Sequence, residues 1–410
     1  MSATHHVPDL SGERLTLDGA GSNLRRVAYG LGVAGLVVTG LLGARGGAET
    51  WQRAMLSYLQ NYMYFLSIML GALFFVLIQH LTRAGWSVTI RRFAEAFAAN
   101  APLMAVLVLP IVIPVLMGND PFFQWTKPAV VAEEPLLQWK SGYLNPTFFL
   151  IRVVVYFAAW TLMGTWFFRS SVRQDESGDP AITQRMQKWS APLIYVFAFT
   201  LTGAAIDFMM SLEPTWFSTM WGVYYFAGSA LAFFATLPLV SRGVQRAGRV
   251  TGLITVEHYH DMGKLVFAFV IFWAYIAFSQ YMLYWYANIP EETQWFLRRQ
   301  TGEWTNWSWF LLIGHFIVPF LALMSRVPKR SGVALTVGAS WMLIMHWVDL
   351  YYIVMPHASE GVVPLSAVDV AAFVGIGGLF LGAFLTRMNG CALIPKRDPR
   401  LGESLAFENF

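Results

Sequence analysis

Ten apolar segments, each long enough to cross a lipid bilayer, constrain the fold of this chain more than any other feature of its sequence. A helix needs roughly 17 to 25 mainly apolar residues to span the hydrocarbon core. Because lipid offers no hydrogen bonds to the backbone, helices are the expected form of such segments. The sequence therefore predicts an all-α polytopic membrane protein. The ten segments are residues 27–43, 55–80, 101–117, 146–169, 189–212, 216–241, 263–288, 304–326, 333–355 and 365–387.

Composition agrees with this class and excludes several others. Of the 410 residues, 56% are apolar and 13% are charged, whereas roughly 25% are charged in soluble domains. The single cysteine, Cys391, excludes a disulfide framework and any iron–sulfur cluster held by this chain alone. The sequence also lacks the glycine-rich phosphate loops, zinc-ligand spacings and nucleophile motifs of soluble enzymes.

The distribution of Lys and Arg predicts the orientation in the membrane. Of the 28 basic residues, 21 fall on the side of the N-terminus and 6 fall in the opposite loops. The remaining one, Arg152, lies within the fourth apolar segment. Loops rich in Lys and Arg stay in the cytoplasm, so we expect residues 1–26 and 389–410 to be cytoplasmic. Since topology accounts for the basic residues, the net charge of +4 indicates no nucleic-acid partner.

One basic amphipathic stretch lies outside the ten apolar segments. It reads RAGWSVTIRRFAEAF and covers residues 83–97. Helices of this kind often lie in the membrane interface, with one face in lipid and the charged face in water. We therefore expect residues 83–97 to lie along the cytoplasmic lipid surface.

An internal repeat relates the fifth and ninth apolar segments. WSAPLIYVFAFTLTGAAIDFMMSLEP ends in the same pattern as GVALTVGASWMLIMHWVDLYYIVMP. In this register Asp207 and Asp349 each precede a proline, Pro214 and Pro356, by seven residues. The alignment pairs each helix with the one four positions later, so both copies run in the same direction, as in parallel transporter repeats.

This repeat predicts two related four-helix bundles between two flanking helices. The first bundle covers residues 55–215 and the second covers residues 216–356. The flanking helices, with their loops, cover residues 27–54 and 357–388.

The segment HWVDLYYIVMP, residues 346–356, carries the most informative polar residues. His346 and Asp349 are three residues apart and therefore share one face of a helix. His315, on the preceding apolar segment, is expected at a similar depth. Ionisable groups inside a membrane are costly and usually functional. The alternative is structural: each acid only holds a neighbouring helix by a hydrogen bond.

A second polar group lies at the cytoplasmic mouth of the seventh segment, in TVEHYHDMGKL. It contains Glu257, His258, His260, Asp261 and Lys264. Ladders of His and carboxylate groups carry protons through membrane pumps. We therefore expect a proton path from this cluster through the mid-membrane histidines to the acid of the ninth segment. A solvated surface cluster without such a role is the alternative.

Arg152 and Asp207 form a candidate polar cluster near the outer leaflet. They lie on adjacent apolar segments at similar depth, so a guanidinium–carboxylate pair is expected. Such a pair would be structural.

Two mid-depth histidines also raise the possibility of a haem ligated by His315 and His346. Bis-histidine ligation needs facing imidazoles and room for the macrocycle. Bulky residues flank both histidines, and no second pair is present. We expect no haem, flavin or metal to be held by this chain.

Three stretches resemble a known family: GALFFVLIQHLTRAGWSVTIRR (71–92), SLEPTWFSTMWGVYYFAGS (211–229) and HDMGKLVFAFVIFWAYIAFSQYMLYWYANIPEETQW (260–295). They resemble the NrfD-like, polysulfide-reductase-type membrane subunits. Within that family they are most similar to the second, smaller such subunit of alternative complex III, a bacterial quinol:electron-acceptor oxidoreductase. The resemblance extends over essentially all ten helices.

This resemblance implies a subunit of the bacterial inner membrane that carries no cofactor of its own. Its implied partners are a sister NrfD-like subunit, an iron–sulfur subunit and multihaem cytochrome c subunits, which hold the iron–sulfur clusters and haem c. The family's quinol pocket uses a histidine and an acid of the first bundle near the outer face. Here that bundle offers Asp207, but its only histidine, His80, is at the cytoplasmic end.

We therefore expect proton translocation or scaffolding rather than quinol oxidation in this chain, and no catalytic residue. Two alternatives stay open. The chain is an independent secondary transporter, or it is a haem-bearing membrane cytochrome.

Overall fold

The computed structural model describes residues 10–409, and these contain ten helical spans long and apolar enough to cross a membrane. No strand occurs among the described residues. The prediction of an all-α polytopic membrane protein is confirmed. The single-helix spans are α1 (Ser22–Ala44), α2 (Gly47–Leu81), α8 (Pro146–Ser177), α9 (Pro180–Phe208), α10 (Trp221–Arg246), α11 (Val256–Ala287), α16 (Gly332–Val354) and α17 (Ala367–Asn389).

Two further spans are built from successive helical pieces. The third consists of α3 (Val88–Ala98), α4 (Ala101–Leu107) and α5 (Leu109–Leu116). The eighth consists of α13 (Trp304–Leu311), the π-helical turn η3 (Leu312–Ile317) and α14 (Val318–Leu323). Short helices complete the chain: η1 (Gln124–Thr126), α6 (Pro128–Glu133), α7 (Pro135–Lys140), η2 (Met210–Leu212), α12 (Pro290–Arg299), α15 (Arg326–Arg330), η4 (Met355–His357) and α18 (Leu401–Leu405).

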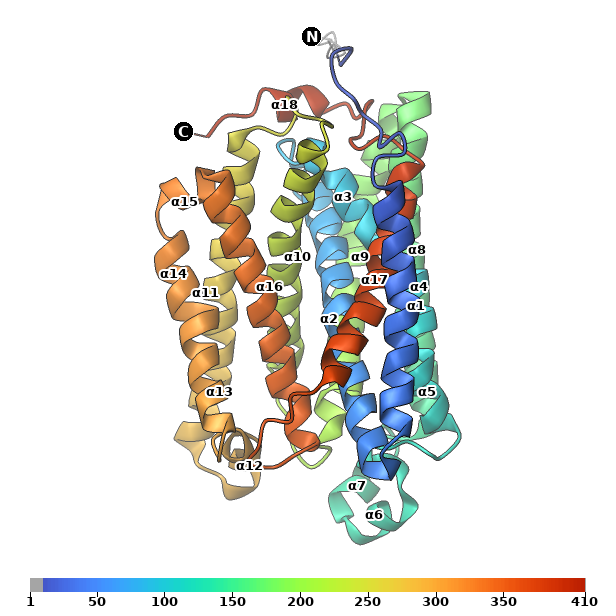
Figure 1. The fold of residues 1–410 in the computed structure, drawn as a ribbon, viewed down its shortest axis with the longest axis vertical. Coiled ribbons are helices and arrows are strands. Elements are labelled where there is room, and N and C mark those ends of the chain that lie inside the picture. Colours follow the sequence, from blue (N-terminus) through green and yellow to red (C-terminus); the bar gives the residue numbers. More distant parts are fainter. Residues whose placement is uncertain (1–9, 410) are drawn as a thin grey trace.

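The long helices run side by side along the long axis of the molecule (Figure 1). The start of α1 and the short helix α18 lie at one end, which we call the terminal end. The short helices α6, α7 and α12 lie at the opposite end, which we call the far end. The two ends of the described chain therefore lie on the same side of the helices, as an even number of spans requires.

Helix α2 is the central element of the packing. In its most apolar stretch, 89% of the residues are buried. The helix contacts α1, α3, α9, α10, α16 and α17. Helix α8 packs on α9 and α3, while α10 packs on α11 and α16. The contact between α2 and α10 joins these two groups of helices.

The flanking helices α1 and α17 pack backbone against backbone. A Cβ atom added at Gly35 would lie 2.5 Å from the backbone nitrogen of Gly375, and one at Gly378 would lie 2.5 Å from the carbonyl oxygen of Ala28. Small residues permit such close approach, which is a main source of helix association in membranes. The pair α1–α17 covers one side of α2.

The prediction that residues 83–97 lie on the lipid surface is wrong. Every residue of α3 is buried, and α3 begins a span that continues to Leu116. Its charges are met inside the protein: Arg92 pairs with Glu95 and Asp175, and Arg91 pairs with Asp398. Because both signs are present and hydrogen-bonded, the helix can be buried.

Several predicted boundaries also change. The first span begins at Ser22 rather than 27, the second at Gly47 rather than 55, and the third at Val88 rather than 101. In each case the helix extends through polar residues that lie beyond the apolar run. Residues 389–409 pack against the helices in part, since Ile394 and Leu401 are buried. Residues 1–9 of the predicted N-terminal segment lie outside the described residues.

Candidate functional site

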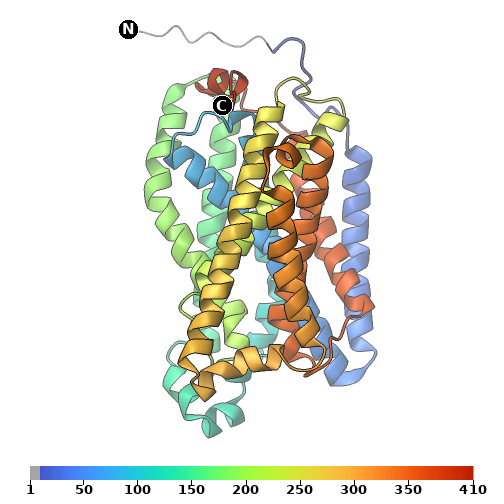
Figure 2. The ribbon, with the colours of Figure 1, turned by 90° about the vertical axis from the view of Figure 1, so that its left-hand side faces the viewer.

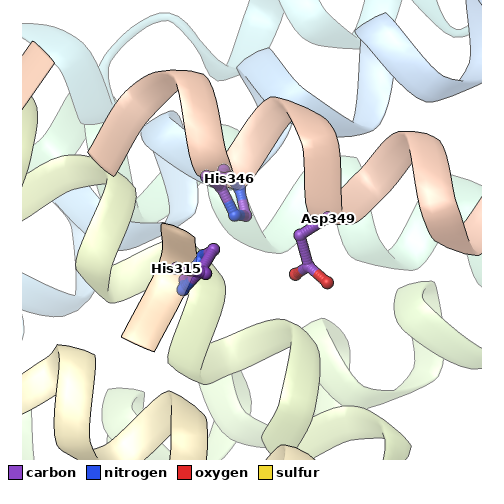
Figure 3. A group of neighbouring side chains, drawn as sticks. All are labelled: His315, His346 and Asp349. Atoms are coloured by element: carbon purple, nitrogen blue, oxygen red, sulfur yellow. The ribbon is translucent and has the colours of Figure 1, made fainter. Parts of the chain in front are cut away.

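Three buried titratable side chains, carried by η3 and α16, lie close together. His315, from η3, faces His346 and Asp349, which share one face of α16 (Figure 3). None of the three is more than 1% exposed. One ring nitrogen of each histidine and one carboxylate oxygen of Asp349 lie within 4.8 Å of one another. We call these three residues the buried triad.

The carboxylate of Asp349 is hydrogen-bonded but has no cation partner. Tyr224 donates its hydroxyl hydrogen to Oδ1, and the indole Nε1 of Trp273 donates to Oδ2 at 3.1 Å. No Lys, Arg or His of the described chain forms a salt bridge with it. Both oxygens of Asp349 are therefore satisfied by neutral donors on α10 and α11, and no cation offsets the cost of burying a charge there.

The imidazole of His346 is held in one orientation. Its Nε2 lies 2.8 Å from Oγ of Ser67, whose own hydroxyl donates to the carbonyl oxygen of Tyr64 at 2.6 Å. Ser67 must therefore accept from Nε2–H, which leaves Nδ1 as the bare acceptor nitrogen. That Nδ1 is buried and has no partner. Gly228 makes room for the ring, because a Cβ there would lie 2.8 Å from Cε1 of His346.

His315 sits in the only π-helical turn of the described residues. Such turns insert one extra residue and often occur at functional sites. The ring stacks on Trp273 with centroids 3.7 Å apart, and both ring nitrogens are buried without a partner. The triad thus contains three imidazole nitrogens without a hydrogen-bond partner, next to a carboxylate. Buried polar atoms in proteins are normally hydrogen-bonded, so this arrangement is unusual.

Two imidazoles and one carboxylate are also residue types that bind divalent metals. In the triad, however, both oxygens of Asp349 already accept hydrogen bonds, and Trp273 covers one face of the His315 ring. The expectation that no metal is held here stays a prediction. The arrangement suits proton exchange through one bridging water, because the three groups lie within 4.8 Å of one another and none of the described hydrogen bonds joins them directly.

The predicted pairing of Arg152 with Asp207 is present. The two Asp207 oxygens accept from Nε and Nη2 of Arg152 at 2.8 and 2.9 Å, and Tyr156 adds a third hydrogen bond of 2.8 Å. The guanidinium also lies over the ring of Tyr143. Two acids at matching positions of the sequence repeat therefore differ: Asp207 is neutralised by a cation, whereas Asp349 is not.

The residues of the predicted cytoplasmic cluster lie at the terminal end and make local contacts. Glu257 forms a two-point ion pair with Arg330, Asp261 pairs with Lys264, and His258 accepts from the backbone nitrogen of Thr255. The Glu257 carboxylate raises the pKa of Arg330 above its ordinary value.

This cluster is not brought together with the triad. His260, whose Nδ1 is buried and unpaired, precedes Trp273 by thirteen residues, about 20 Å along a helix. No hydrogen bond of the described residues links the two groups.

Sequence reasoning missed Tyr224, Trp273 and Ser67, the three side chains that hold the triad in place. In a chain with 16% aromatic residues, nothing in the local sequence distinguishes these two aromatics from core residues. It also missed a cavity of about 890 Å³ at the far end, whose wall includes Tyr224 and Trp273.

Comparison with known proteins adds no identification. No protein-family model matches this chain, and no curated protein matches it. The resemblance to NrfD-like subunits therefore rests on the three sequence stretches alone.

Proposed function

We propose that this chain is a bilayer-embedded subunit of a bacterial quinol:electron-acceptor oxidoreductase of the alternative complex III type, and that its buried triad takes part in moving protons. The observation that carries the proton role is the cation-free carboxylate of Asp349, fully buried beside two imidazoles with unpaired nitrogens. Groups like these are retained inside membranes where they bind or relay ions.

The chemistry of the triad supports a relay with a defined order of contacts. His346 keeps its proton on Nε2 toward Ser67, so its bare Nδ1 is the position that accepts another proton. Asp349 exchanges a proton with an imidazole of His346 or His315 through a bridging water, since one carboxylate oxygen and one nitrogen of each ring lie within 4.8 Å of one another. Tyr224 and Trp273 both donate hydrogen bonds to the acid, so they position Asp349 beside the imidazoles.

The partners are part of the proposal. A sister NrfD-like subunit, an iron–sulfur subunit and multihaem cytochrome c subunits supply the quinol site and the redox centres, and this chain is cofactor-free. The membrane is the bacterial inner membrane, with the terminal end in the cytoplasm. The excess of basic residues at that end supports this orientation.

Replacing Asp349 with asparagine tests the proton role. Asp349→Asn keeps the shape of the side chain and removes the titrating group. In the intact complex in sealed vesicles, quinol oxidation should continue while the number of protons taken up per electron falls. Asp120→Asn is the control, because Asp120 is a buried acid of a far-end loop that bonds only to nearby groups. If Asp349→Asn takes up the same number of protons per electron as the unaltered complex, the acid is only a structural hydrogen-bond acceptor.

An independent secondary transporter is the second candidate. The observation that favours it is the interrupted third span, in which α3, α4 and α5 are separate helical pieces. Transporters place such interruptions at their binding sites. Transport of a solute by the purified chain in vesicles, without partners, would favour this candidate over the first.

A further inference from the structure

The cavity at the far end has the size and lining of a small-molecule site. Its volume of about 890 Å³ falls within the range of ligand pockets, roughly 300 to 1,000 Å³. It is bounded by side chains of α10, α11, α12, α13, η3 and α16. The lining is mostly aromatic and contains no Lys, Arg, Asp, Glu or His. A ligand buried there must therefore be neutral.

The cavity opens sideways toward lipid. Five of its lining residues are at least 39% exposed although they belong to membrane spans: Ile271, Tyr275, Phe278, Trp309 and Leu312. Helices α11 and α13 separate toward the far end, where α12 crosses between them (Figure 2). A ligand entering between these helices comes from the bilayer, so it must be lipid-soluble.

The inner end of the cavity carries directed hydrogen-bonding groups. Gln280 is only 3% exposed, and its Oε1 accepts from Oγ of Ser218 at 3.1 Å. Its amide Nε2 has no partner in the described chain and is left as a donor. Tyr224 and Trp273 line the same cavity. An acyl chain has no oxygen to accept from Gln280, and a phosphate headgroup would find no basic side chain.

We propose that this cavity binds a neutral, lipid-soluble ring compound whose carbonyl or hydroxyl oxygen accepts a hydrogen bond from Gln280. Flat rings fit the aromatic walls, since offset stacking on aromatic side chains is favourable. The bound ring lies against Trp273 and Tyr224, which also contact Asp349. This inference does not depend on the proposed proton role.

Two kinds of membrane compound share this chemistry, and the test separates them. The full chain is purified in nanodiscs of dioleoylphosphatidylglycerol, and equilibrium binding of two radiolabelled probes is measured: decyl-benzoquinone, which is redox-active, and cholesterol, which is not. Saturable binding of either probe at one site per chain is expected. The probe that binds more tightly shows whether the cavity prefers a redox-active quinone or a redox-inert sterol.

Two variants assign that binding to the cavity. Gln280→Leu removes the donor at similar volume and should lower the affinity about fivefold, the effect of one neutral hydrogen bond. Ala277→Phe fills the cavity and should lower it more than tenfold. Ala158→Phe, on the exposed face of α8, is the matched control and should change nothing.

Absence of saturable binding by the unaltered chain would overturn the proposal. Equal binding to Gln280→Leu and the unaltered chain would overturn it as well. A variant that fails to fold is recognised by its lost thermal transition, and the other variant then decides the assignment.

Discussion

The indole nitrogen of Trp273 donates a 3.1 Å hydrogen bond to the carboxylate of Asp349. The same indole ring stacks on His315. One side chain of α11 therefore fixes the acid of α16 and the imidazole of η3 relative to each other. The triad is a positioned group rather than three polar residues that happen to be buried.

The first prediction concerns this indole. Trp273→Phe keeps an aromatic ring against His315 and removes the hydrogen bond to Asp349. We expect the chain in detergent to lose about 1–3 kcal/mol of stability, the cost of leaving a buried acceptor unsatisfied. Proton uptake per electron in the complex should also fall. Trp307→Phe is a suitable control, since its indole donates to a backbone carbonyl instead. Loss of stability with normal proton uptake would show that Trp273 supports only the fold.

A second prediction concerns the space that Gly228 leaves for His346. Gly228→Ala places a methyl group 2.8 Å from Cε1 of the imidazole, so the ring must move and its bond to Ser67 should break. We expect a loss of about 1–3 kcal/mol in thermal unfolding, as for other overpacked cores.

Gly243→Ala provides the matched comparison on the same helix, because nothing lies within 4 Å of its added Cβ. It should leave stability unchanged or raise it by up to about 1 kcal/mol, the helix-propensity difference between alanine and glycine. Equal melting behaviour of the two variants would contradict the close approach of α10 to His346.

The third prediction contrasts the two acids of the repeat. Asp207→Asn leaves the buried guanidinium of Arg152 without its counter-charge, so we expect a loss of about 3–5 kcal/mol. The double variant Arg152→Met/Asp207→Leu should recover most of that stability, since it removes both charges. Proton stoichiometry in the assembled complex should be normal in the double variant. A double variant less stable than Asp207→Asn would show that the ion pair is not the source of the effect.

The sequence alone predicts those parts of the site that depend on helical spacing and depth. His346 and Asp349 share a face because they are three residues apart, and Arg152 meets Asp207 because both lie at similar depth on adjacent helices. The depth of His315 can be predicted in the same way, because neighbouring antiparallel helices bring residues of equal depth together.

Features that depend on partners far away in the sequence cannot be predicted in this way. Arg91 and Arg92 give α3 the pattern of a surface helix, and only the fold shows that Asp398 and Asp175 neutralise them. No feature of the sequence around His315 predicts the π-helical turn that holds it. Tyr224 and Trp273 are likewise assigned by contact, because their local sequence matches that of many lipid-facing or core aromatics.

The proposed proton role requires that Asp349 gains and loses a proton during turnover. Infrared difference spectroscopy of the intact complex, recorded between its quinol-reduced and oxidised states, measures this directly through the C=O stretch of a protonated carboxyl group. We predict a carboxyl band that changes between the two states and is absent in Asp349→Asn, while it persists in Asp120→Asn. A difference spectrum identical in Asp349→Asn and the unaltered complex would contradict the claim.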